Sequence, residues 1–237
     1  MAVVASWLGN DTGTGASNTL SVTVPAGAEL LFVFYSDEQV AVVTPTATYN
    51  GGAPTGTVGV STGTGLNLAC WYWATPTSGT HDVSLTGLSS LLHFYAVVSI
   101  EGSDGTFDAD VIHEHGATSA TLTGGAISSA IGDLLLGFCG VNNSTAGDHS
   151  STGTGATEIY DLGQGDMGAS AAEWAGAASV TPGFSWTSGD NIATGIFFNV
   201  NAASGASGIQ WMPAIRVVRG QRGHTLVSGY TPPTKVE

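Results

Sequence analysis

Apolar and polar residues alternate with a period of two through most of this chain. In TLSVTV, residues 19–24, the leucine and both valines fall on one face of an extended strand, and the PAG that follows provides a turn. The next segment, AELLFVFYS at 28–36, is a continuous apolar run, which is typical of a strand covered on both faces. The pattern therefore predicts β-strands in this region, both half-buried and fully buried.

Further strand candidates share this short apolar or alternating character and are separated by turn sequences such as NGG, TPTSG and GSDG. They lie at 2–7, 40–43, 46–50, 56–60, 66–74, 81–87, 91–101, 118–124, 133–141, 156–162, 183–188 and 191–201. The alanines of GASAAEWAGAAS, residues 168–179, favour a helix, but its glycines and strand-rich surroundings favour a strand of small residues. So many short strands at this spacing predict an all-β fold, either a sandwich or a barrel.

Charge divides the chain into two unequal parts. Four basic residues stand against 18 acidic ones, and residues 1–214 contain no Lys or Arg. An acidic body without cations cannot neutralise phosphates, and an anionic membrane surface repels it. We therefore expect neither nucleic acid nor membrane as a partner of the body.

A small-residue linker, NAASGASG at 201–208, follows the last strongly apolar strand. We therefore predict a β-sandwich domain at 1–202, then a linker and an extended basic C-terminal arm at 203–237. Its three prolines suit an extended segment, since each lacks a backbone donor. Basic and apolar side chains together predict that the arm binds a partner, through Trp211, Ile215, Arg216, Arg219, Arg222, Leu226, Tyr230 and Lys235.

Four segments carry a resemblance to known proteins: LACWYWATPTSGTHDVSLTG at 68–87, LLHFYAVVSIEGSD at 91–104, GDLLLGFCGV at 132–141 and GFSWTSGDNIATGIFFNVNA at 183–202. They resemble the jelly-roll-like β-sandwich domains of tailed-phage virion structural proteins and bacterial surface proteins. The resemblance implies an antiparallel jelly-roll-like β-sandwich in a particle-associated or extracellular setting, and it carries no catalytic residue to this chain. The arm lies outside it.

Two pairs of side chains are candidates for ligand binding. Trp71 and Trp73 fall on one face of a strand, where exposed rings would stack on a sugar, although aromatics in an apolar run more often belong to the core. His113 and His115 also share a strand face and are weak candidates for a metal pair without a visible third ligand, so we expect no metal and no cofactor.

Signals for catalysis are absent from the sequence. It contains no G-x-S-x-G, H-E-x-x-H or P-loop motif, and the adjacent Asp148, His149 and Ser150 cannot act as a relay, because triads are assembled from distant positions. We therefore expect no enzyme. Cys70 and Cys139 lie in apolar strands, which favours buried free thiols, while a disulfide between them stays open.

These features predict a virion structural protein, foremost a phage capsid decoration or cement protein that binds other copies or the shell through its arm. The alternatives are a tail or head-fibre component, an extracellular filament subunit, or a carbohydrate-binding surface module with a glycan as partner. The first residues lack the basic region of a secretory signal. We therefore expect a virion protein assembled in the host cytoplasm, with the extracellular surface as the alternative location.

Overall fold

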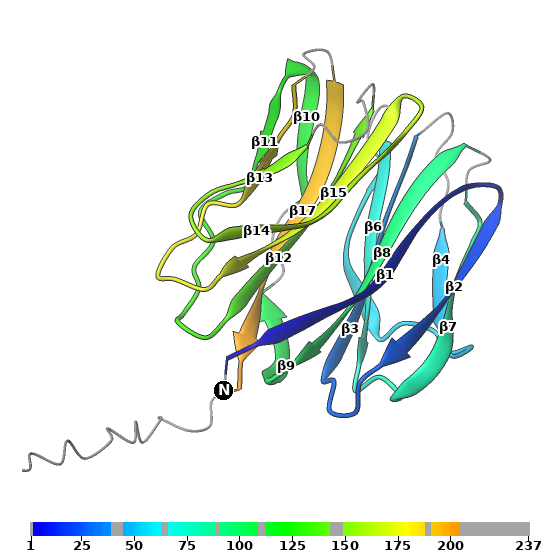
Figure 1. The fold of residues 1–237 in the computed structure, drawn as a ribbon, viewed down its shortest axis with the longest axis vertical. Helices are drawn as coiled ribbons and strands as arrows, with labels where there is room; N and C mark the ends of the chain where they lie inside the picture. Colours follow the sequence, from blue (N-terminus) through cyan, green and yellow to red (C-terminus); the bar gives the residue numbers. More distant parts are fainter. Residues whose placement is uncertain are drawn as a thin grey trace, which may run out of the picture. The chain divides into compact units, whose positions relative to one another are not determined.

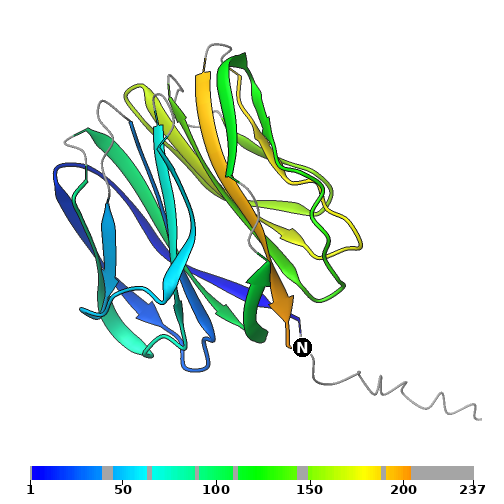
Figure 2. The same ribbon diagram turned by 180° about the vertical axis from the view of Figure 1, so that it is seen from behind.

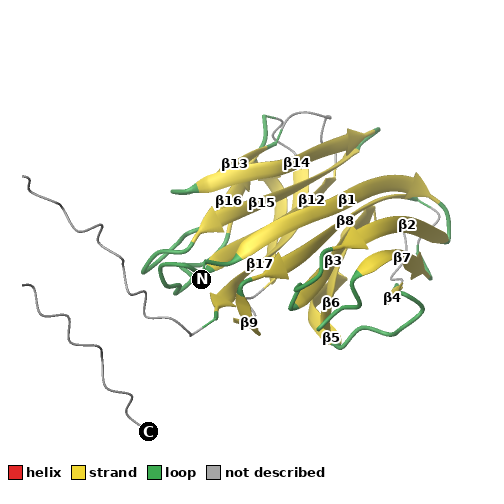
Figure 3. Cartoon of the chain, turned by 60° about the horizontal axis from the view of Figure 1, so that its bottom comes forward, coloured by secondary structure: helices red, strands yellow, loops and turns green. Residues whose placement is uncertain are grey.

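The computed structural model describes residues 2–38, 45–62, 66–88, 91–108, 112–142, 149–187 and 191–203. These residues form seventeen β-strands and contain no helix (Figures 1 and 3). All pairings between the strands are antiparallel. The predicted all-β antiparallel sandwich is confirmed, and the structure adds that the described chain contains two such sandwiches.

The first sandwich has eight strands in two sheets. Sheet A has the order β1-β8-β3-β6-β5, and sheet B has the order β2-β7-β4. The chain thus passes back and forth between the sheets in the jelly-roll manner, with β5 added beside β6. The strands are β1 (Val4–Thr14), β2 (Ser17–Val24), β3 (Leu30–Glu38), β4 (Thr46–Tyr49), β5 (Gly56–Thr62), β6 (Leu66–Ala74), β7 (Gly79–Thr86) and β8 (Leu92–Glu101).

The second sandwich repeats this topology. Sheet C has the order β10-β17-β12-β15-β14, with β9 also pairing with β17, and sheet D has the order β11-β16-β13. Each strand from β10 to β17 therefore corresponds to the first-sandwich strand whose label is nine lower, and β9 is an addition without a counterpart. The bounds are β9 (Ser103–Asp108), β10 (Ile112–Ser119), β11 (Thr121–Thr123), β12 (Leu134–Asn142), β13 (Ser150–Thr152), β14 (Ala156–Gln164), β15 (Met167–Ala175), β16 (Gly183–Ser185) and β17 (Asn191–Ala202).

Local details also match between the two sandwiches. The ladder between β5 and β6 shifts register between Thr57 and Gly59, and the equivalent ladder between β14 and β15 shifts between Glu158 and Tyr160. The indole of Trp73 donates to a loop carbonyl, that of Gly52, and the equivalent Trp174 donates to the carbonyl of Thr152. A bulge and a tryptophan anchor at corresponding places make the two halves structural repeats of one unit.

The four sheets stack in the order B, A, C, D. One hydrophobic core lies between sheets A and B, one between C and D, and the largest joins sheets A and C. Figures 1 and 2 show the two halves side by side, the first in blue to green-cyan and the second in green to orange. Since both inner sheets are covered on two faces, the described body is one packed unit.

This layering explains the sequence pattern of the strands. Every residue from Leu30 to Asp37 in β3 is buried, because sheet A lies between two other sheets. In β7 of the outer sheet B, only Val83 and Leu85 are buried and their neighbours face solvent. The small-residue segment forms a buried strand, β15, as predicted. The predicted strand at 40–43 and the C-terminal arm lie outside the described residues.

Candidate functional site

The predicted site residues fall into three groups in the structure. Those of the arm lie outside the described residues. His113 and His115 lie in β10, opposite Gly195 and Ala193 of β17, but their side chains are not among those described. Among the described residues, no three or more His, Cys, Asp or Glu side chains are grouped so as to hold a metal.

Trp71 and Trp73 lie in the core between sheets A and B, with exposed fractions of 5% and 6%. Neither ring offers an open face on which a sugar could stack. Trp71 does line the floor of an uncharged depression of about 390 Å³ between β4 and β5, together with Ala47, Pro54 and Thr57. The depression exists because β5 joins sheet A and leaves this flank of the first sandwich open.

The two cysteines are free and buried in different cores. Cys70 faces the core between sheets A and C, whereas Cys139 faces the core between sheets C and D. Burial raises the pKa of both thiols above the ordinary value. They are therefore protonated, inert core residues, and the disulfide left open by the sequence is absent.

A row of polar side chains interrupts the core of the first sandwich at one end of sheet A. His93 of β8, Asp37 of β3 and Asn67 of β6 are direct neighbours across three adjacent strands. Their exposed fractions are 1%, 0% and 2%. On its own strand each lies two residues from a member of the core between sheets A and B, namely Tyr35, Ala69 or Tyr95, so all three point into that space. We call these three residues the polar row.

Only part of the polar row is hydrogen-bonded. The hydroxyl of Tyr35 donates to Asp37 Oδ2 over 2.7 Å. Among the described residues, Asp37 Oδ1 and both amide atoms of Asn67 have no hydrogen-bond partner. Buried polar atoms in folded proteins are nearly always paired, with protein, water or an ion. The polar row therefore leaves three atoms available to a further group.

His93 is held as a neutral imidazole. Asn18 Nδ2 lies 3.3 Å from His93 Nε2, so this ring nitrogen accepts a hydrogen bond, and Nδ1 lies 3.4 Å from the carbonyl of Leu91, to which it donates. Burial lowers the pKa of His93, and this outweighs the opposing effects of the Leu91 hydrogen bond and the charge of Asp37. His93 consequently supplies no positive charge to Asp37.

The lowered pKa of His93 predicts that the folded protein loses stability in weak acid. The unfolded chain protonates His93 near pH 6.5 and the folded chain only below it, so stability is full above that pH and falls as the pH decreases through it. The decline is at most about 1.4 kcal/mol per pH unit. Urea unfolding between pH 7.5 and 5 should show it, and His93→Gln should flatten it; an equally steep decline in the variant would contradict the assignment.

Asp133 affects stability in a lower pH range than His93 does. Burial opposes its ionisation, but hydrogen bonds from the backbone of Ala202 and Ala130 and from the Asn199 amide more than compensate, and the pKa of Asp133 falls below 3.8. The stability it contributes is present above about pH 4 and is lost only below it. The two pH windows are therefore separate.

The second sandwich shows that the fold does not require the polar row. Strand pairing places Val141, Ala193 and Gly168 at the positions equivalent to Asp37, His93 and Asn67. A Cβ at Gly168 would overlap the ring of His149, so this side chain fills the space instead. His149 pairs with Asp161, Nδ1 to Oδ1 at 2.9 Å. The equivalent strand positions of the second sandwich thus carry no polar side chain, and the buried histidine beside them is paired.

The sequence contains a signal for the polar row that our sequence analysis missed. Asp37 ends the series Leu31, Val33, Tyr35 at period two, in a strand that is otherwise continuously apolar. The same holds for Asn67 before Ala69, and for the histidine of LLHFYAVV. A polar residue at the inward position of three strands is a recognisable departure from alternation. Their meeting in one row depends on register, which the sequence does not state.

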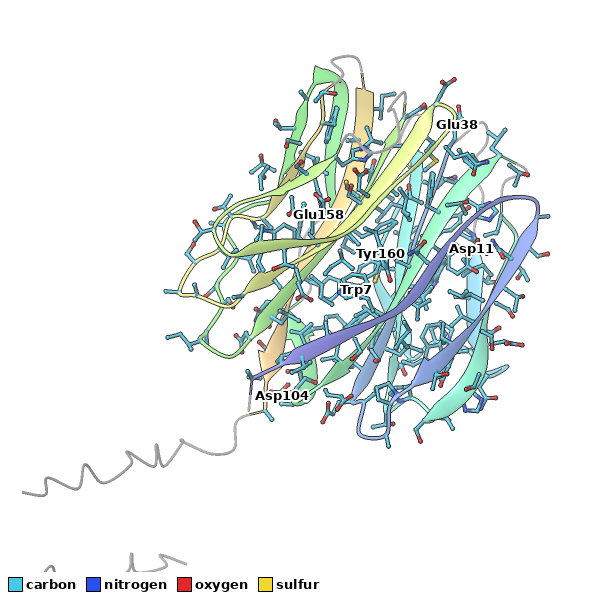
Figure 4. The ribbon with its side chains drawn as sticks, in the orientation of Figure 1. Trp7, Asp11, Glu38, Asp104, Glu158 and Tyr160 are labelled. Carbon is cyan, nitrogen blue, oxygen red and sulfur yellow. The ribbon has the colours of Figure 1, made fainter. Side chains whose placement is uncertain are left out.

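A second candidate surface lies at the free edges of β1 and β14. Trp7 of β1 donates through Nε1 to Glu173 Oε2 at 3.3 Å, and its ring meets Tyr160 of β14 edge to face at 5.6 Å. Figure 4 shows Trp7 and Tyr160 together between the sandwiches, with Asp11 and Glu158 to either side on the same two strands. Carboxylates and half-buried aromatics thus accompany two edge strands.

The fold defines this chain as a tandem jelly-roll β-sandwich protein. Comparison with models of protein families, with curated proteins and with solved structures finds no match. None of the described segments forms a helix with the length and apolar character needed to cross a bilayer.

Proposed function

We propose that this chain is a phage virion structural protein, a capsid decoration or cement subunit that joins copies of itself through residues 203–237. One observation carries the proposal: every Lys and Arg of the chain lies in 216–235, beyond a body that holds 17 of the 18 acidic residues. Identical acidic bodies repel one another, and a basic arm that reaches a neighbour replaces repulsion with attraction. The virion setting rests on the sequence resemblance, and we expect no catalytic activity.

The edges of β1 and β14 suit such an arm. Within the described residues, β1 pairs only with β8 and β14 only with β15, so each strand has a free side. Asp11, Glu158 and Glu173 supply negative charge there, while β5, an edge strand on the other side, has no charged residue. An extended arm with alternating apolar residues can add a strand to such an edge, with backbone hydrogen bonds supplying affinity.

A zero-length cross-linker tests this docking, because Lys235 is the only lysine of the chain. Carbodiimide joins an amine to a carboxylate with which it is in contact. In a mixture of ¹⁴N- and ¹⁵N-labelled full-length protein, we expect mixed-isotope peptides that link Lys235 to Asp11, Glu158 or Glu173. Lys235→Gln is the matched control and should remove these peptides. Links to these carboxylates within a single chain only, or to none of them, would contradict intermolecular docking at this surface.

A further inference from the structure

We propose that Asp37 and Asn67 of the polar row bind a hard, oxygen-preferring metal cation, for which Ca²⁺ is the natural probe. The site lies inside the first sandwich, and the inference is independent of the arm and of the proposed function.

The first argument is the uncompensated charge of Asp37. Its side chain is fully buried and accepts one hydrogen bond among the described residues, from the Tyr35 hydroxyl. A buried carboxylate is costly unless it is paired or coordinates a metal. Residues 1–214 contain no Lys or Arg, and the ring nitrogens of the adjacent His93 lie against Asn18 Nδ2 and the Leu91 carbonyl rather than against Asp37. The body itself therefore offers no fixed cation to Asp37.

The second argument is the geometry of free oxygen atoms. Asp37 and Asn67 are direct partners on neighbouring strands, which places their Cβ atoms about 4.5–5.5 Å apart. Asp37 Oδ1 and Asn67 Oδ1 are both buried and have no partner among the described residues. A carboxylate oxygen beside a neutral amide oxygen is a donor pair preferred by Ca²⁺, Mg²⁺ and Mn²⁺, whereas Zn²⁺ and Cu²⁺ favour nitrogen or sulfur ligands.

The third argument is the comparison between the two repeats. The second sandwich forms the same strands, the same order and the same bulge with Val141 and Gly168 in place of Asp37 and Asn67. At this place in the second sandwich the polar group that fills the space beside Gly168 is His149, and it is paired with Asp161. Buried unpaired polar atoms destabilise a fold, so a site that retains three of them indicates a bound group that repays their burial.

The number and charge of the protein ligands determine the expected affinity for Ca²⁺. The described residues contribute one carboxylate and neutral oxygens, with no cluster of three or more acidic or histidine side chains. Affinity for Ca²⁺ decreases as the number of charged ligands decreases, so for a single carboxylate we expect a dissociation constant of about 10⁻⁴–10⁻³ M, as in weak extracellular sites. Water completes the coordination of a cation bound by so few protein atoms.

Thermal unfolding of the full-length protein with and without Ca²⁺ tests the site. At about 10 mM Ca²⁺, roughly ten to a hundred times the expected dissociation constant, the unfolding temperature should rise by about 3–11 °C relative to EDTA. Asp37→Asn should abolish this rise and, in EDTA, be at least as stable as the unaltered protein because it removes an uncompensated charge. The control Asp82→Asn, at an exposed carboxylate of sheet B, should keep the full response.

A second variant keeps the test decisive if Asp37→Asn folds poorly. Asn67→Asp adds a charged ligand beside Asp37 and should tighten Ca²⁺ binding at least about tenfold in isothermal titration. The proposal is overturned if Ca²⁺, Mg²⁺ and Mn²⁺ all leave the unfolding temperature unchanged, which would mean that the polar row holds water only. It is also overturned if Asp37→Asn responds to Ca²⁺ as strongly as the unaltered protein does.

Discussion

Phe34→Ala is expected to lower the free energy of unfolding by about 3–5 kcal/mol, the usual range for removing a buried phenylalanine. Phe34 is fully buried in β3 and faces the second sandwich. Its ring stacks on Phe138 at 5.4 Å and on Phe198 at 5.9 Å, both of sheet C, and on Trp7 at 6.1 Å. The truncation therefore removes contacts that hold sheets A and C of the two sandwiches together.

Urea unfolding followed by tryptophan fluorescence measures this effect. Val60→Ala in β5 is the matched control, because Val60 is 48% exposed and its truncation should change the free energy of unfolding by less than about 0.5 kcal/mol. A loss below about 1 kcal/mol for Phe34→Ala would contradict a packed interface between sheets A and C, since the ring would then have little to lose.

Gly140→Ala is expected to cost about 1–3 kcal/mol through overpacking at the same interface. A Cβ at Gly140 of β12 would overlap Ser36 Oγ of β3 and lie 2.8 Å from Ser36 Cβ. Gly140 and Ser36 belong to different sandwiches, so their close approach depends on how sheet A packs against sheet C. Glycine is needed here for space, because the backbone at Gly140 does not have a positive φ.

A double-mutant cycle with Ser36→Gly tests the contact directly. Ser36→Gly alone should cost about 0.5–1 kcal/mol, as glycine does within a strand. In the double variant it should recover at least about 1 kcal/mol of the Gly140→Ala loss, because both clashing atoms are removed. Strict additivity of the two changes would mean that Gly140 and Ser36 do not meet.

Much of the fold is predictable from the strands themselves. The continuous apolar run of β3 predicts a strand covered on both faces, and sheet A is indeed an inner layer. The alternation of β7 predicts a half-exposed strand, which is its place in sheet B. Local periodicity is enough to predict burial in these cases. A strand buried on one face alternates between apolar and polar residues, and a strand buried on two faces is continuously apolar.

The duplication was not predicted, since equivalent strands preserve shape rather than chemistry. β6 reads LNLACWYWA, whereas its counterpart β15 reads MGASAAEWA, and only the Trp and the final Ala correspond clearly. The small residues of β15 fit because ring side chains of neighbouring strands, such as that of Phe138, occupy the space. Which strands pair, and therefore which halves repeat, is a long-range property that alternation does not encode.

Of the candidate sites, one can be recognised from the sequence alone and another depends on how the strands pair. The charge of the arm is visible in the sequence, because it depends only on composition along the chain. The sequence shows the three inward-facing polar residues of the polar row but not that they meet, because Asp37, Asn67 and His93 come from three separate strands and become neighbours only through register. Trp71 and Trp73 illustrate the converse, since their spacing fits a stacking platform but sheet B covers them.

The measurement that tests the central claim most directly is sedimentation velocity of the full-length protein beside a chain ending at Ala203, each in low and high salt. The proposed function predicts that only the full-length protein associates and that salt weakens its association, because the basic arm binds acidic neighbours. If both proteins sediment as monomers, or if both associate equally, the arm does not join copies of this protein.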